Sequence, residues 1–154
     1  MRAPDLWFEL LDRFGQRLSP LGKIAEIRRG ITTGNDDFFL VVDATSECLE
    51  AFENPAEFLE NYGVPRNLAR NGSVKLVRAG EGHAKIHAIE SIFLEPEVHS
   101  LMEISGFTVT PKESRRLILL VNKKKEDLKG THVLEYIRWG ESNGIHKGST
   151  CASR

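Results

Sequence analysis

The 154-residue sequence has only two cysteines, Cys48 and Cys151, which are far apart and form no Cys-x-x-Cys pair. This scarcity argues against a disulfide framework or a zinc knuckle, and it favours a reducing compartment. No apolar run approaches the ~20 residues that a membrane-spanning helix needs, and the N-terminus lacks the apolar core of a signal peptide. We therefore expect a cytoplasmic protein with no membrane partner.

Motifs for catalysis are also missing. Gly30 and Gly34 have the spacing of part of a phosphate loop, but no Gly-Lys-Ser/Thr follows them. His83 and His87 are four residues apart, yet they do not form the His-Glu-x-x-His pattern of a zinc enzyme. No Gly-x-Ser-x-Gly elbow is present, and the Gly/Ser-rich tail around Cys151 offers nothing to lower a thiol pKa. We expect no catalytic residue and no metal ligand.

Acidic residues gather between positions 36 and 60, and they leave a metal-dependent nuclease as an alternative function. Helix capping by Asn54 and Glu57 explains part of this cluster better, because the two residues have the spacing of a capping box. The remaining acidic side chains are typical of a solvated helix face.

The net charge of −1 conceals an uneven distribution. Residues 111–154 carry 10 Lys and Arg against 5 Asp and Glu, whereas residues 1–110 carry 11 against 17. Clustered cations displace counterions from phosphates, so the split indicates a C-terminal part that faces a polyanion. A solvated charged surface is the alternative interpretation.

Helical patterns cover four segments. The first, residues 5–14, places apolar side chains at helical spacing. In the acidic segment 43–63, Asn54 is the expected cap, Pro55 the first helical position and Gly63 the end. The third helix is expected from Pro96 to residue 106. The fourth runs from the cap Thr131 to residue 140, with Val133, Leu134, Ile137 and Trp139 facing inward.

Short apolar runs at residues 38–42, 74–77, 89–94 and 117–121 are strand candidates. A further strand from residue 24, a polar turn at 32–36 and the run at 38–42 would form a strand–loop–strand unit. The mixture predicts one α+β domain over residues 1–154, with a mixed or antiparallel sheet and flanking helices. Residues 141–154 lack apolar periodicity and end abruptly, which we interpret as truncation within a larger protein.

The segment from Arg28 to Asn35 combines guanidinium, hydroxyl and amide groups on a turn that glycines punctuate. Such groups are suited to phosphate contacts and to hydrogen bonds with base edges. An ordinary turn between strands, closed by its threonines, is the alternative. Further basic groups bracket the strand at 117–121 and occupy the polar tail. The candidate DNA-binding residues are Arg28, Arg29, Thr32, Thr33, Asn35, Arg115, Arg116, Lys124, His146 and Lys147.

Two parts of the sequence resemble one family. Residues 2–5 (RAPD) and 21–40 (LGKIAEIRRGITTGNDDFFL) resemble the start of the specificity region in N-6 adenine DNA methylases, as found in type IIG and TaqI-like restriction–modification enzymes. Residues 128–131 (LKGT), 136–141 (YIRWGE) and 150–154 (TCASR) are similar to a second signature of that family. The aromatic Trp-Tyr pair that usually continues this signature is missing. The resemblance spans most of the chain.

The resemblance implies a non-catalytic target-recognition domain for an adenine-N6 DNA methyltransferase, with or without restriction activity. In such enzymes a separate domain binds S-adenosylmethionine and holds the flipped adenine at an Asn/Asp-Pro-Pro-Tyr/Phe motif. That tetrapeptide is absent here. The implied partners are double-stranded DNA and the methyltransferase catalytic domain, and this chain itself would hold no cofactor. Docking of the helix at 131–139 on a methyltransferase subunit is the alternative.

Overall fold

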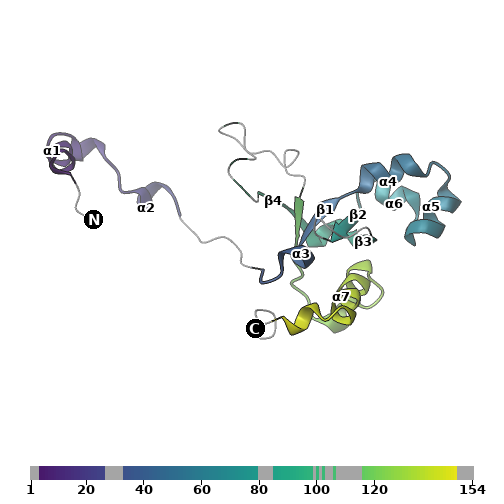
Figure 1. Ribbon diagram of the computed structural model, residues 1–154. Coiled ribbons are helices and arrows are strands. Elements are labelled where there is room, and N and C mark those ends of the chain that lie inside the picture. Colours follow the sequence, from purple (N-terminus) through teal and green to yellow (C-terminus); the bar gives the residue numbers. More distant parts are fainter. Residues whose placement is uncertain are drawn as a thin grey trace. The chain divides into compact units, whose positions relative to one another are not determined.

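A computed structural model describes residues 4–26, 33–79, 85–98, 100, 102, 106 and 116–148. The contacts divide the chain into two compact units, residues 1–32 and 33–154. The first unit contains α1 (Asp5–Phe14), the short η1 (Gly15–Arg17) and α2 (Leu21–Ile24) (Figure 1). The helix expected at residues 5–14 is confirmed.

The prediction that a strand begins at residue 24 is wrong. Ile24 closes α2, and the backbone N–H of Ala25 donates to the Leu21 carbonyl at 2.9 Å. Pro20 is the residue before this single helical turn, and its backbone is extended, with a φ of −55° and a ψ of 136°. Residues 27–31 of the expected strand lie outside the described residues.

The second unit is built on a five-stranded antiparallel sheet. Its strands are β1 (Leu40–Asp43), β2 (Val74–Ala79), β3 (Ile86–Glu90), β4 (Leu94–Glu97) and β5 (Arg116–Leu119), in the spatial order β3-β2-β1-β5-β4. The central strand β1 pairs on both sides, with Val41 opposite Ala79 in β2 and Leu117 in β5. Helices flank this sheet, so the expected α+β class with an antiparallel sheet is confirmed.

The two faces of the sheet carry different helices. Leu76 and Val77 are neighbours in β2 and therefore point to opposite faces. Leu76 joins a small core under α4 (Thr45–Ala51), α5 (Pro55–Tyr62) and α6 (Arg66–Arg70). Val77 joins the larger core, which includes residues of α7 (His132–Ser142). Figure 1 shows α4, α5 and α6 grouped together and α7 lying separately from them.

Residues 38 and 39 do not begin a strand as expected. They end α3 (Asp36–Phe39), and only residues 40–43 are extended. Asn35 causes the difference, since its side-chain oxygen accepts a hydrogen bond from the backbone N–H of Phe38 at 3.1 Å. Asp36 and Asp37 then occupy the first turn, where the helix dipole favours negative charge.

The helix expected from Pro96 to residue 106 does not begin at Pro96, and most of residues 99–105 lie outside the described residues. Pro96 lies within β4, opposite Leu117 of β5. Because β4 is an edge strand, a proline there can face outward without removing a hydrogen bond of the ladder. The expected strand at 89–94 is interrupted by η2 (Ser91–Phe93), which connects β3 to β4.

The caps expected at Asn54 and Thr131 are present, but within residues 33–79 the Glu57 carboxylate does not accept from the Asn54 N–H to complete a capping box. The Asn54 side chain accepts from Ala56 N–H at 2.9 Å, and Gly63 ends α5 with a φ of 67°. Thr131 accepts from Leu134 N–H at 3.4 Å. Gly140, however, does not stop α7, which continues to Ser142.

Candidate nucleic-acid interface

Helix α7 is fixed at its start by a carboxylate from the sheet. Glu90, the last residue of β3, accepts hydrogen bonds from the backbone N–H groups of His132 at 2.7 Å and Val133 at 3.0 Å. The first N–H groups of a helix have no partner within the helix, so this carboxylate satisfies two of them and complements the helix dipole. The N-terminal end of α7 is therefore attached directly to β3.

An aromatic stack fixes the middle of α7. The ring of Tyr136 lies parallel to that of Phe38 at 4.7 Å, and its hydroxyl donates to the Phe38 carbonyl at 2.8 Å. Tyr136 is only 1% exposed, so it is a core residue and cannot stack on a nucleobase. Trp139 is half-buried and packs against the same core. The expected inward orientation of this helix face is confirmed.

Basic side chains from three segments meet at the C-terminal end of α7. They are Lys125 in η4 (Lys125–Leu128), Arg138 in α7 and His146 in η5 (Ile145–Lys147). Both η4 and η5 contact α7. Together with their exposed neighbours Lys124 and Lys147, these residues form what we call the α7-end basic cluster.

Glu141 lies within this cluster. The Lys125 ammonium group donates to both of its carboxylate oxygens at 2.7 Å. The pKa of the Glu141 carboxyl is lowered, first by this hydrogen bond and then by the positive charges of Lys125, His146 and Arg138. The hydrogen bonds from Lys125 place its ammonium group at this end of α7, and Arg138 lies on the same helix face as Glu141.

The predicted DNA-binding residues fall into different places. His146 belongs to the α7-end basic cluster, and Lys124 and Lys147 are the exposed sequence neighbours of its members Lys125 and His146. Thr33 and Asn35 instead stabilise the start of α3, where the Thr33 hydroxyl donates to the Asp36 carboxylate and Asn35 caps the helix. The local role of Thr33 and Asn35 is therefore to stabilise the first turn of α3.

Arg116 does not belong to the cluster, because it is the first residue of β5. It lies directly across from Glu97 of β4 on one side and Val42 of β1 on the other. Opposite charges at such paired positions stabilise a sheet. The predicted residues Arg28, Arg29, Thr32 and Arg115 lie outside the described residues.

Sequence reasoning missed two members of the cluster, Lys125 and Arg138. Lys125 belongs to the run Lys123–Lys125, from which only the middle residue was selected. Arg138 lies three residues before Glu141, so the two share a helix face. That spacing was a signal for the site, but the position of η4 beside this helix end depends on tertiary packing.

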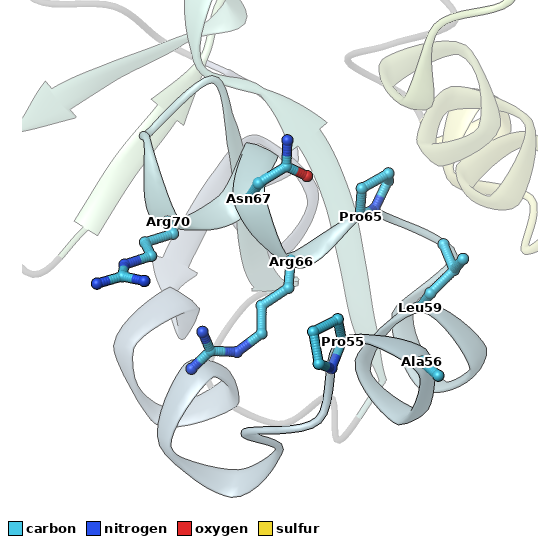
Figure 2. A pocket seen from close by; sticks show the side chains of 7 residues that line it. All are labelled: Pro55, Ala56, Leu59, Pro65, Arg66, Asn67 and Arg70. Carbon is cyan, nitrogen blue, oxygen red and sulfur yellow. The ribbon is translucent and has the colours of Figure 1, made fainter.

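A groove of about 570 Å³ lies between α5 and α6, and Figure 2 shows its lining. Its floor is largely apolar. The guanidinium group of Arg66 donates from Nε to the Phe52 carbonyl and from a terminal nitrogen to the Leu49 carbonyl, both at 3.0 Å. This cation therefore joins α6 to the end of α4. The lining residues are Pro55, Ala56, Leu59, Pro65, Arg66, Asn67 and Arg70.

The acidic stretch does not gather into a metal site. Asp43 is paired with Lys75, and Glu47 is paired with Arg78 at 2.6 Å. Burial alone would raise the pKa of Asp43, but hydrogen bonds from Lys75 and Thr45 lower it overall. Among the residues that the structure describes, no three His, Cys, Asp or Glu side chains are arranged to hold a metal ion.

Comparison with protein-family models, with curated proteins and with solved structures finds no match. None of the helices within the described ranges has both the length and the apolar composition that crossing a bilayer demands.

Proposed function

We propose that this chain recognises double-stranded DNA on behalf of an adenine-N6 DNA methyltransferase of a restriction–modification system. In this proposal the chain contacts phosphates and base edges. A separate catalytic domain binds S-adenosylmethionine and transfers the methyl group. The observation that supports DNA binding is the α7-end basic cluster, to which three separate segments contribute cations. The resemblance of residues 21–40 and 136–141 to methylase specificity regions supports the link to methylation.

The cluster has the properties that a phosphate-binding surface needs. Lys124, Arg138, His146 and Lys147 are exposed, so their charged groups can reach a ligand without first leaving the core. Lysine and arginine bind phosphates by displacing condensed counterions, and such contacts set the register of a protein on the duplex. Helix α7, which carries Arg138, is held by Glu90 at its start. The helix that carries Arg138 is therefore fixed to the sheet.

The alternative function is docking of helix 131–139 on a methyltransferase subunit. Val133, Leu134 and Tyr136 are all buried in the core of the second unit. A partner protein would therefore contact the exposed face of α7, which carries Glu135 and Arg138.

The binding of the whole chain to labelled duplex DNA, measured by fluorescence anisotropy at several salt concentrations, tests the proposal. If three to five cations each neutralise a phosphate, log K should fall against log salt with a slope of about −3 to −4.5. The double variant Arg138→Gln/Lys147→Gln should bind more weakly and reduce the slope by about 2.

The matched control removes the same charges elsewhere, at the exposed residues Arg70 and Lys85. Arg70→Gln/Lys85→Gln should bind nearly as the wild type does. No binding by the wild-type chain at low salt, or an equal loss in both double variants, would reject the α7-end basic cluster as the interface.

The link to methylation needs a separate experiment. The chain is combined with the methyltransferase domain encoded in the same or a neighbouring reading frame, and transfer of labelled methyl groups to duplex DNA is measured. We expect methylated adenine with the combination and none with the chain alone. A neighbourhood without any such methyltransferase would contradict this part of the proposal.

A further inference from the structure

Glu141 is an acidic residue placed among cations. Its carboxylate accepts two hydrogen bonds from Lys125, and its side chain is 40% exposed while that of Lys125 is 54% exposed. A duplex phosphate would offer Lys125 the same kind of ligand, an anionic oxygen. The carboxylate and the phosphate would therefore compete for one ammonium group.

We propose that Glu141 attenuates DNA binding by occupying Lys125, so that a phosphate must displace the carboxylate before Lys125 contributes to affinity. This inference rests on the proposed function, because it assigns a regulatory residue to the same surface. The exchange is feasible since exposed ion pairs are weak and are screened by salt. The Lys125 ammonium group can therefore exchange the Glu141 carboxylate for a phosphate.

The consequence concerns specificity. Phosphate contacts are independent of base sequence and supply nearly all of non-specific binding. The Glu141 carboxylate competes with phosphates for Lys125. It therefore weakens every DNA complex in which Lys125 is not well placed to contact a phosphate. Complexes in which base contacts fix the register can still recruit Lys125. Glu141 therefore favours the correct DNA site by lowering the affinity for all other DNA sequences. Specificity is a difference between affinities, and a repulsive group can increase that difference.

The test uses Glu141→Gln, which keeps the shape of the side chain and removes its charge. We expect this variant to bind a duplex of arbitrary sequence about two- to five-fold more tightly, in keeping with the strength of exposed ion pairs. The salt slope should become steeper by about 0.9, since one more phosphate is neutralised. Glu135→Gln is the matched control: Glu135 is exposed on α7 but lies near the other end of the helix.

The role of Lys125 is tested by repeating the comparison in a Lys125→Gln background. There the steeper slope on Glu141→Gln should disappear, because no ammonium group remains to be released. The melting temperature of each variant checks that the fold is retained.

The outcomes separate the two proposals. If the wild type binds as proposed and Glu141→Gln binds no more tightly, only the attenuation is overturned. A slope change that persists without Lys125, or that Glu135→Gln reproduces, also overturns it. If neither the wild type nor Glu141→Gln binds duplex DNA at low salt, the proposed function and the attenuation both fall.

Discussion

Replacing Gly140 with alanine would test how closely α7 packs on the sheet. Gly140 is buried in the third turn of the helix. A Cβ atom added there would lie 2.3 Å from Cε2 of Phe38 and 3.0 Å from its Cδ2 and Cζ atoms. Phe38 is only 7% exposed, and its ring is stacked on that of Tyr136. It therefore has little room to move away.

Two effects of opposite sign set the magnitude. Alanine is favoured over glycine inside a helix by about 1 kcal/mol. Overpacking a well-filled core costs about 1–3 kcal/mol, and occasionally more. A contact of 2.3 Å to a confined ring belongs at the upper end of that range. The free energy of unfolding should therefore fall by about 2 kcal/mol in Gly140→Ala.

Urea denaturation followed by circular dichroism measures this loss. With a slope of about 2 kcal/mol per molar urea, the midpoint should move down by about 1 M. Gly22→Ala is the control, since Gly22 is also helical and its added Cβ would meet nothing within 4 Å. Phe38→Leu should recover part of the loss in the Gly140→Ala background. A Gly140→Ala protein at least as stable as the wild type would refute the reasoning.

Two further predictions concern stability. Glu90→Ala removes both acceptors at the start of α7 and should lower the free energy of unfolding by about 1–2 kcal/mol in urea titrations. Glu90→Gln keeps one acceptor and should lose less, so equal losses would contradict the capping role. The second prediction concerns alkaline pH. Burial and the neighbouring Cys48 thiol raise the pKa of Tyr62 to about 12, and burial raises the pKa of Tyr136. The folded chain thus retains phenolic protons that the unfolded chain loses above pH 10. The associated stability is complete below pH 10 and is lost as the pH rises toward the folded pKa values. Tyrosinate absorbance that develops in the folded protein near pH 10 would contradict this.

The features that the sequence predicted correctly are those with local causes. The caps at Asn54 and Thr131 depend on a side chain and the turn that follows it, and both are present. The apolar run at 74–77 forms a strand whose alternating side chains Leu76 and Val77 join the two cores. The run expected at 117–121 forms a strand as far as Leu119, and Leu117 and Leu119 join the larger core. The general class therefore followed from periodicity and capping alone.

The wrong predictions depend on partners distant in sequence. Pro96 suits the first turn of a helix, but pairing with β5 makes it part of an edge strand. Gly140 resembles a helix stop, yet α7 continues to Ser142, and the glycine instead leaves the space that the Phe38 ring occupies. Residues 38 and 39 are an exception, since Asn35 followed by two aspartates was a local capping signal that could have been recognised.

The candidate site combines residues that the sequence indicates with residues that only the folded chain brings near them. The positive character of residues 111–154 is visible in the sequence, and it indicates Lys124, His146 and Lys147. Lys125 and Arg138 are not among the predicted residues, because Lys125 lies beside Glu141 at the end of α7 only in the folded chain. Thr33 and Asn35 carry suitable hydrogen-bonding groups, but these groups are used to form α3.

The central place of β1 has a consequence for biosynthesis. One side of β1 pairs with β2 soon after both emerge from the ribosome, but the other side pairs residue 40 with residue 118. Until β5 is synthesised, β1 presents a row of open backbone N–H and C=O groups, which can pair with another nascent chain. Polypeptides interrupted before residue 116 should therefore accumulate in the insoluble fraction, and complete translation is what closes the sheet.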